Sequence, residues 1–379
     1  MSRARGRPGG ARRFDVVRLL DGLHRWSGGL IGLLLVVIGF SGLMLVHKDA
    51  WLRATLPHAA DARSTDAGRT VSAMTAIFSD PRATSVILAS PSLSVHRVTY
   101  GDAGHGAYVD QAGRVVTRWD SKWARPEVWL FDLHHYLLAG DVGKTVAGFA
   151  GLMGIGFVVT GVILWWRTRR SFEWRLWPRA WTRFGILRHH RDLGVLAAPL
   201  LIVTFATGAM MTLKPIEAAV LSLFSSKADL ATAAAVPARK GGAYVPGAAD
   251  WARILQTAGR RFPDAQVRVI TVPSKPGALI AVRLRQSGEP TPNGRTFLWF
   301  DPADGALVGV RDARALPTGL RIAAYEYPIH SGKIGGWFWI GAITLSGLAL
   351  ITLGGFGVYT FWFNRGSPRK PVRRRANQA

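Results

Sequence analysis

Cysteine is absent from this 379-residue sequence, and charged residues are scarce. A chain without thiolates has no disulfides and cannot hold Cys-ligated zinc, an iron–sulfur cluster, blue copper or covalently attached c-type haem. Any metal must therefore be held by His, Met, carboxylate or a non-covalently bound cofactor. Charged residues make up 19% of the chain, below the roughly 25% that is usual in soluble proteins.

Four long stretches contain no charged residue at all. They are Trp26–Val46, Thr145–Trp166, Leu193–Leu213 and Ile334–Asn364. A helix that crosses the bilayer needs about 20 predominantly apolar residues, so each stretch is long enough to do so. The sequence therefore excludes a soluble globular protein and predicts four spans in contact with the lipid bilayer.

The net charge of +25 is concentrated on one side of these spans. Seven Arg precede the first span, eight lie within 167–191, and six Lys or Arg follow Phe363. Positive residues accumulate on the cytoplasmic side of membrane proteins. We therefore expect a multi-pass membrane protein with both termini in the cytoplasm. Motifs of RNA-binding proteins do not accompany the basic residues, so no nucleic-acid partner is expected.

The two long segments between spans have the patterns of small α+β units. Helical spacing, or alternation of apolar and polar residues, predicts short elements in both. The expected helices are 71–78 and 249–261, and the expected strands are 85–88, 95–100, 108–115 (strand, turn, strand), 267–272, 279–284, 297–301 and 307–310.

An internal duplication relates the two halves of the chain. His24 opens the first span and His190 the third, and each is followed 18 residues later by a glycine, Gly42 or Gly208, in a Ser/Thr-Gly step. The second and fourth spans match without a gap at an offset of 196 residues. The sequence thus predicts two parallel repeats, each made of a span, an outer domain and a second span.

The expected fold class is a membrane α-helical protein, in which a four-helix transmembrane bundle carries two α+β periplasmic domains. The expected layout is 1–46 N-terminus and first span, 47–143 first outer domain, 144–166 second span, 167–191 basic cytoplasmic loop, 192–213 third span, 214–333 second outer domain, 334–363 fourth span and 364–379 basic tail.

The duplication selects four of the ten histidines as two symmetric pairs. His24 corresponds to His190, and His134 to His330, whereas three other histidines at span borders, His47, His135 and His189, lack a His counterpart. A histidine at a membrane border can simply lie among lipid headgroups. Two imidazoles that face each other across a bundle can instead fill both axial positions of a haem iron.

The spacing also predicts two depths for these pairs. His24 and His190 begin spans, so we expect them at the cytoplasmic face, and His134 and His330 precede spans, so we expect them at the periplasmic face. Straight helices would separate the two levels by about 30 Å or more. The glycines Gly28, Gly194, Gly151 and Gly347 would let a flat macrocycle approach, or they serve ordinary helix packing.

Several motifs resemble the PepSY-associated transmembrane family of bacterial inner-membrane proteins. They are LHRWSG at 23–28, LHHYLLAG at 133–140 and TGVILWW at 160–166, and the resemblance extends from about Phe14 to Phe363. Phe297–Asp301 with its Pro-Ala-Asp-Gly turn resembles the end of a PepSY domain. His135 stands where the family often has Arg, and the internal symmetry favours His134 as the ligand.

The resemblance implies a reductase of ferric siderophores with two non-covalent haem b groups, whose iron ligands would be His24, His190, His134 and His330. The sequence has no G-x-G-x-x-G between a strand and a helix, so electrons must come from a membrane quinol or a separate reductase. We expect the outer domains to bind an anionic or neutral metal chelate in the groove between them and the bundle.

Two other functions remain open. One is a non-redox PepSY scaffold that binds a periplasmic peptide, protease or chelate. The other is a small-molecule permease, which the sequence favours less because the four spans contain no charged residue.

Overall fold

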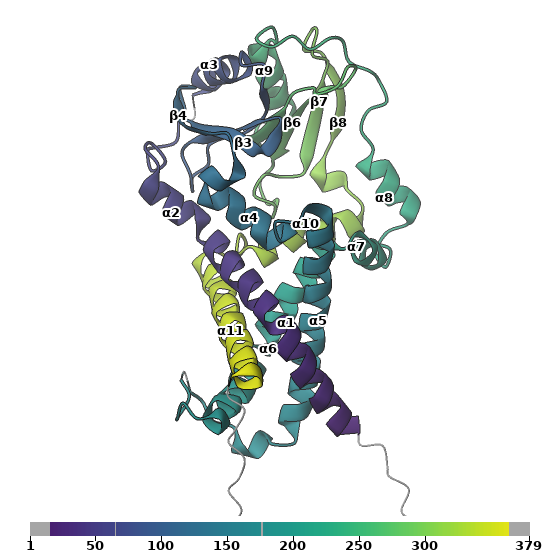
Figure 1. Cartoon of the computed structure of the whole chain (residues 1–379). Helices are drawn as coiled ribbons and strands as arrows, with labels where there is room; N and C mark the ends of the chain where they lie inside the picture. The colour runs from purple at the N-terminus through teal and green to yellow at the C-terminus, as the bar shows by residue number, and fades with distance from the viewer. Residues whose placement is uncertain (1–15, 65, 176, 364–379) are drawn as a thin grey trace, which may run out of the picture.

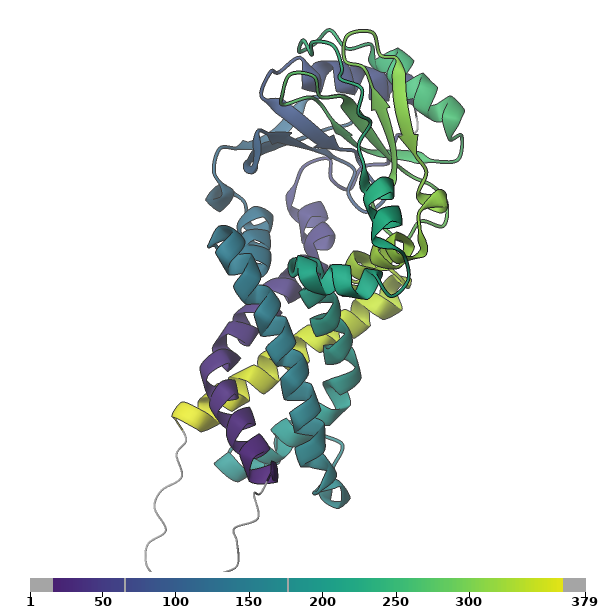
Figure 2. The same cartoon turned by 90° about the vertical axis from the view of Figure 1, so that its right-hand side faces the viewer.

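This computed structural model describes residues 16–64, 66–175 and 177–363. A bundle of four long helices carries one β-sheet domain at one of its ends (Figures 1 and 2). The helices are α1 (Val16–Val46), α2 (Lys48–Thr55), α3 (Ala67–Phe78), α4 (Pro126–Tyr136), α5 (Gly140–Trp166), α6 (Arg183–Thr212), α7 (Lys214–Leu221), α8 (Lys227–Ala234), α9 (Trp251–Arg261), α10 (Thr318–His330) and α11 (Gly336–Trp362), with 3-10 turns η1 (Lys122–Ala124), η2 (Arg169–Ser171) and η3 (Ala313–Ala315). The strands are β1 (Ala83–Ile87), β2 (His96–Tyr100), β3 (Asp102–Val109), β4 (Val115–Trp119), β5 (Gln266–Thr271), β6 (Ile280–Arg285), β7 (Thr296–Phe300) and β8 (Leu307–Arg311).

Four helices of the described chain are long and apolar enough to cross a membrane, namely α1, α5, α6 and α11. This confirms the four predicted spans. Helices α1 and α6 begin about ten residues before their uncharged stretches, because a helix can continue past the bilayer border into polar sequence. The hydroxyl of Thr182 caps α6 by accepting a hydrogen bond from the amide of Gly185 at 3.2 Å. Helix α1 starts, and α11 ends, at the end of the bundle away from the sheet domain (Figure 1).

Small residues let the bundle helices approach closely. Helix α1 packs along α11 and α5 along α6, while α6 also contacts α11 and α1 contacts α5. A Cβ atom added to Gly354 of α11 would lie 3.0 Å from the carbonyl oxygen of Gly32 in α1. Packing of this kind replaces the hydrophobic effect, which does not drive helices together inside a lipid phase. The buried core of the bundle consists of Leu35, Ala150, Val158, Ala197, Ala198, Leu201, Phe205 and Ala349.

The eight strands form one antiparallel sheet in the order β4-β3-β2-β1-β5-β6-β7-β8. Each predicted outer segment supplies four strands as a meander, and the helices and strands expected in it are confirmed to within a few residues. The two meanders join where β1 pairs with β5, with Val86 opposite Ile270. The sequence predicted the two units but not that their sheets are continuous, because the edge at which two sheets join leaves no pattern distinct from that of an inner strand.

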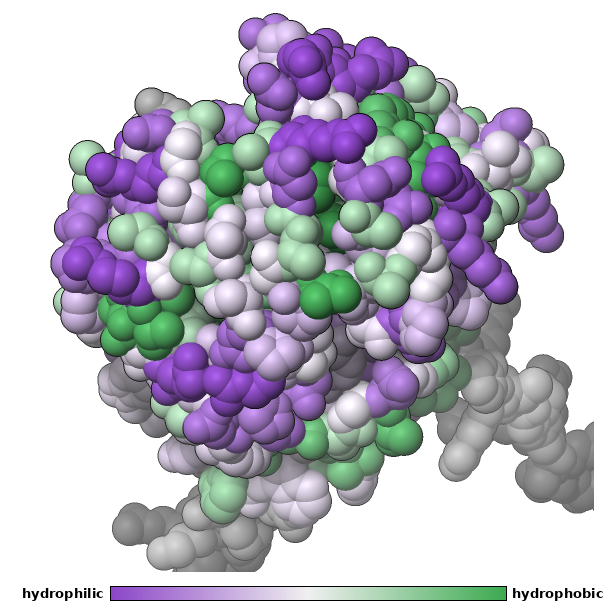
Figure 3. Space-filling view, turned by 90° about the horizontal axis from the view of Figure 1, so that it is seen from above, coloured by the Kyte–Doolittle hydropathy of each residue, from purple (hydrophilic) through white to green (hydrophobic). Residues whose placement is uncertain are grey.

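Helices cover the two faces of the sheet differently. Helices α3 and α9 pack on the face away from the bundle, where Phe78 stacks on Trp251 with ring centroids 4.8 Å apart. Residues of α2 and α4 pack with Tyr108 of β3 and Trp119 of β4. The outer surface of this domain is mostly hydrophilic, with small separate hydrophobic patches (Figure 3), as expected for a surface in water.

We predict that a disulfide can bridge the junction of the two meanders. Ser85 and Thr271 are direct partners across β1 and β5, so their Cα atoms lie within the range that a disulfide spans. The natural chain has no cysteine, so a Ser85→Cys/Thr271→Cys protein has no competing thiol. Oxidation in membranes should shift its mobility on a non-reducing gel.

The matched control for this bridge is Thr99→Cys/Thr271→Cys. Thr99 lies on β2, and β1 separates it from β5, so the two sites are about 10 Å apart and should not bridge. Bridging of the control but not of the Ser85/Thr271 protein would contradict the continuous sheet.

Candidate functional site

The four histidines selected by the duplication lie together as two pairs. His134 near the end of α4 faces His330 at the end of α10, with ring centroids 6.0 Å apart, and we call these two the near pair because they lie close to the sheet domain. His24 of α1 faces His190 of α6 with ring centroids 6.3 Å apart, and we call these two the far pair. The predicted pairing is therefore present in the structure, whereas a role as iron ligands stays a prediction.

Hydrogen bonds to helix carbonyls orient the rings of the near pair. Nδ1 of His134 lies 2.9 Å from the carbonyl oxygen of Ile38, and Nδ1 of His330 lies 3.1 Å from that of Thr204. A carbonyl oxygen can only accept, so Nδ1 must carry the proton and donate. Ser41 and Thr207 place hydroxyls within 3.2 and 3.1 Å of the same two nitrogens.

The other ring nitrogen of the near pair is left available. Nε2 of His134 and Nε2 of His330 make no hydrogen bond to any residue that the structure describes. An imidazole that donates through Nδ1 to a backbone carbonyl presents a lone pair at Nε2, which is the usual arrangement of a metal-ligating histidine. The near pair thus has the tautomer that a metal ligand needs.

A glycine of a neighbouring helix lies against each of the four rings. A Cβ atom on Gly42 would be 2.7 Å from Cε1 of His134, and one on Gly208 would be 3.1 Å from Cε1 of His330. Gly161 and Gly357 lie against His24 and His190 in the same way, with distances of 3.6 and 4.0 Å. At Gly42 and Gly208 a side chain would displace the imidazole.

The far pair is less uniformly hydrogen-bonded. Nδ1 of His24 lies 2.8 Å from the hydroxyl of Thr160 in α5, and that hydroxyl donates to the carbonyl oxygen of Gly156 at 2.7 Å. The ring of Phe157 packs edge-on against His24 at 5.5 Å. Nδ1 of His190 is buried beside the backbone of Leu353, without a hydrogen bond of good geometry.

The near pair lies deeper in the bundle than predicted. His134 was expected at a span border. Helix α4 instead ends in a turn in which Leu137 and Leu138 have φ angles of 48° and 60°, and the ring of His134 reaches Ile38 and Gly42 inside α1. Those contacts lie 14 and 18 residues from His24, which is roughly 21–27 Å along a helix. The separation is therefore shorter than the predicted 30 Å.

The spacing within each pair fits one metal ion between two imidazoles. A metal–imidazole bond is about 2.0 Å and a ring nitrogen lies about 1 Å from the ring centre, so ligation on opposite sides separates two centroids by about 6 Å. Both observed separations agree with this value. The described residues contain no group of three or more His, Asp or Glu arranged to hold an ion, so a metal here would need further ligands from a macrocycle.

The three border histidines without a symmetric counterpart lie outside both pairs. Nε2 of His47 is 2.9 Å from the hydroxyl of Thr344, His135 stacks on Phe131, and His189 packs against Phe356. Each ring therefore has a structural partner of its own.

Of the four glycines proposed for close approach, Gly151 and Gly347 serve helix packing. A Cβ atom on Gly151 would lie 3.3 Å from a carbonyl oxygen of α6, and one on Gly347 would lie 3.4 Å from Leu43 of α1. Both nevertheless line the cavity beside the near pair. Gly28 and Gly194 are less closely packed, since a Cβ atom added to them would lie 4.0 and 3.8 Å from the nearest atom of a neighbouring helix.

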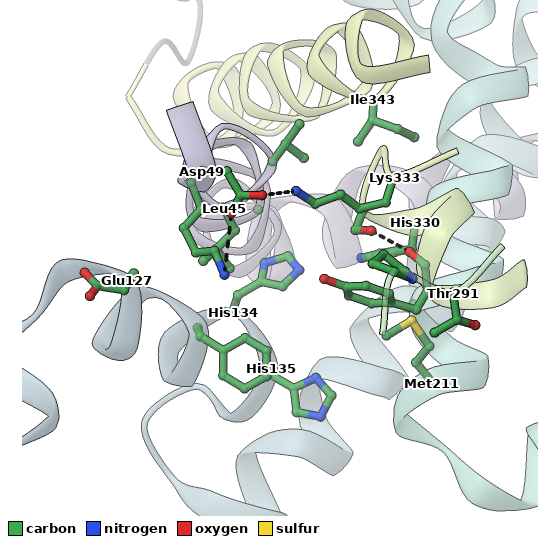
Figure 4. Close-up of a pocket in the computed structure, with 18 of the residues that line it drawn as sticks. Leu45, Asp49, Glu127, His134, His135, Met211, Thr291, His330, Lys333 and Ile343 are labelled. Atoms are coloured by element: carbon green, nitrogen blue, oxygen red, sulfur yellow. Dashed lines mark hydrogen bonds and ion pairs between the residues drawn. The ribbon is translucent and has the colours of Figure 1, made fainter. Parts of the chain in front are cut away.

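A cavity of about 580 Å³ joins the near pair to the sheet domain. Its lower part lies between the bundle helices and is lined by apolar residues and glycines. Its upper part lies against the sheet and carries charge, and Figure 4 shows the ion pair of Asp49 and Lys333 close to both histidines. The charged side chains of the lining are Lys48, Asp49, Arg97, Glu127, Arg268, Arg283, Arg295 and Lys333.

The upper part of the cavity is strongly positive. Six cationic side chains face two carboxylates there, and both carboxylates already have cationic partners: Asp49 bonds Lys333 at 2.8 Å, and Glu127 bonds Arg125 at 2.8 Å. Burial lowers the pKa of Lys48. The charge of Asp49 opposes this shift, whereas the charges of Arg97 and Lys333 add to it. The cavity therefore suits an anionic ligand.

Sequence reasoning missed these cavity cations because they lie far apart in the chain. It noted the Ser/Thr-Gly steps at Gly42 and Gly208 but not that these glycines contact the histidines. The duplication was the available signal, since the same step recurs at the same distance from His24 and His190.

The comparison with known proteins shows the family of the chain. The family model for the PepSY-associated TM region matches residues 22–365, which is most of the chain. The protein belongs to this family. No curated protein matches it, so the residue roles in this PepSY-associated TM protein must be argued from its own structure.

A buried carboxyl of this PepSY-associated TM protein makes stability depend on pH. Glu326 of α10 is 8% exposed, and its Oε1 has no hydrogen-bond partner in the described chain. Burial, together with the charge of Glu217, raises the pKa of Glu326 from 4.5 to about 7. A carboxyl whose pKa is higher in the folded than in the unfolded state lowers the free energy of unfolding as the pH rises from the unfolded-state pKa through the folded-state pKa.

We therefore predict that Glu326→Gln stabilises the protein at pH 8 by roughly 1–3 kcal/mol and changes little at pH 4.5. Thermal unfolding in detergent at the two pH values measures this. Asp264→Asn, at an exposed position, is the control and should leave the thermal unfolding unchanged at both pH values. An equal effect of Glu326→Gln at both pH values would show that the charge of Glu326 is not the cause.

Proposed function

We propose that this protein is an inner-membrane dihaem b reductase that passes electrons across the membrane to a periplasmic ferric chelate, such as a ferric siderophore. Reduction weakens the hold of hard oxygen ligands on iron and so releases Fe(II). The observation that carries the proposal is the pair of facing imidazoles at each of two depths, with centroid separations of 6.0 and 6.3 Å.

The chain's own residues fit haem at both sites. His134 and His330 would hold one group and His24 and His190 the other, without covalent attachment because the chain has no cysteine. When bound, haem supplies reversible one-electron chemistry. The Nδ1 hydrogen bonds to Ile38 and Thr204 hold the near-pair rings in one tautomer, and both rings are half-buried.

The orientation follows from the charge on the chain. The described basic residues at the start of α1, between α5 and α6 and at the start of α6 lie at the end of the bundle away from the sheet, so that end would face the cytoplasm. The far pair would then be close to an electron donor, either a membrane quinol or a separate reductase. The near pair and its positive cavity would face the periplasm, where a chelate arrives.

A non-redox scaffold is the second candidate function. The positive cavity supports it, since six cationic side chains would bind an anionic periplasmic ligand without any electron transfer. The histidine pairs favour the reductase, because a binding scaffold has no need for four half-buried imidazoles that face each other in two pairs.

We predict that His134→Ala and His330→Ala each lose about half of the bound haem and the transfer of electrons to an external acceptor, because one axial ligand of a non-covalent group is removed. The remaining far-pair group should still be reducible. His24→Ala and His190→Ala should lose the other half. Haem content per chain and a dithionite difference spectrum measure these outcomes.

His135→Ala is the matched control, since it changes the residue next to His134 but outside the pair. It should leave the haem content near that of the natural protein, as should His189→Ala. If His135→Ala empties a site while His134→Ala does not, the ligand assignment is wrong although the function can stand.

A further inference from the structure

The cavity beside the near pair changes character along its length. Its lower part is lined by apolar residues and glycines of the bundle, and its upper part by basic residues of the sheet, α2 and the segment after α10. A ligand that fills both parts must combine an apolar body with anionic groups at one end. A volume of about 580 Å³ is within the range of pockets for single small ligands.

The geometry of the sheet directs three arginines into this cavity. Alternation along β2 and β6 sends Val98 and Val282 into the core under α3 and α9, and therefore sends Arg97 and Arg283 to the opposite face. Strict alternation in β5 would place Arg268 on the same face as Ile270. The pairing of β5 with β6 shifts between Val267 and Val269, and this bulge turns Arg268 to the cavity side.

Most of the cavity cations already have partners. Arg268 donates to the carbonyl oxygen of Ala89 at 2.7 Å, Arg283 to that of Gly294 at 2.7 Å and Arg295 to that of Leu320 at 2.9 Å. Lys333 bonds Asp49. These contacts hold four of the six cations in place and satisfy part of their hydrogen-bonding capacity.

The other two cations, Lys48 and Arg97, make weaker contacts. The ammonium of Lys48 is 3.9 Å from the nearest Asp49 oxygen, which is too long for a good hydrogen bond. Nε of Arg97 is buried and makes no hydrogen bond within the described chain. Buried donors of this kind are costly unless a ligand satisfies them. Arg97 and Lys333 both repel the charge of Lys48, which Asp49 offsets, and a ligand anion beside Lys48 and Arg97 would relieve this repulsion further.

We propose that Lys48 and Arg97 bind the propionate carboxylates of a haem held by His134 and His330, so that the carboxylate edge of that haem faces the sheet domain. This inference rests on the proposed function, because it requires haem at the near pair. Lys48 lies six residues beyond Gly42, the glycine that contacts His134, and both residues line the cavity. The macrocycle would occupy the apolar, glycine-lined part, and its carboxylates would reach the cations above.

The proposal makes the near site selective for porphyrins that carry carboxylates. The test uses the full chain with His24→Ala, which leaves only the near site, produced in a haem-deficient host and titrated in detergent with iron protoporphyrin IX or its dimethyl ester. Absorbance gives both dissociation constants. We expect the diacid to bind at least 10-fold tighter than the ester, since two charge-assisted hydrogen bonds are lost with the ester.

Lys48→Gln/Arg97→Gln should reduce this preference to near unity by weakening the diacid and leaving the ester unchanged. Arg114→Gln, at an exposed position just before β4 and outside the cavity lining, removes a positive charge as a control and should keep the full preference. Retention of the preference in the double variant, or equal weakening of diacid and ester, overturns the proposal.

Failure of the proposed function would look different in the same experiment. If neither porphyrin binds the folded chain at all, the near pair does not hold haem, and the proposed function fails together with this inference. If both bind through His134 but without a carboxylate preference, the proposed function stands and only the role of Lys48 and Arg97 is lost.

Discussion

The hydrogen bond between a buried imidazole and a helix carbonyl is the interaction on which the site depends. An imidazole inside an apolar bundle must satisfy its N–H group, because an unpaired donor there costs free energy. Ile38 and Thr204 supply carbonyl oxygens to His134 and His330. Those bonds leave Nε2 free to face the opposing ring, and Gly42 and Gly208 provide the space in which each ring lies.

The sheet domain contributes to the same arrangement from outside the bundle. Helices α4 and α10, which carry the near pair, follow directly on the last strands of the two meanders. The pairing of β1 with β5 joins these meanders into one unit, so the two histidines are positioned by one sheet. The continuous sheet also places Arg97 of β2, Arg268 of β5 and Arg283 of β6 along the same side of the cavity.

The sequence alone predicted a large part of this fold and the residues of both pairs. Uncharged stretches identified four spans because lipid excludes charge, and the duplication identified His24, His190, His134 and His330 because equivalent positions of a repeat meet near its axis. The depth of His134 could not be predicted, since it depends on how α4 ends at Leu137. The position of Arg268 in the cavity could not be predicted either, because a bulge in β5 overrides the alternation of the strand.

The most direct test of the account is the haem content and spectrum of the natural protein, purified from membranes in mild detergent. The account predicts about two haem b per chain, each in a low-spin, bis-imidazole state by electron paramagnetic resonance, with both reducible by dithionite. A folded, monodisperse protein without haem would contradict the reductase proposal and favour a binding scaffold. High-spin haem would contradict axial ligation by the paired histidines.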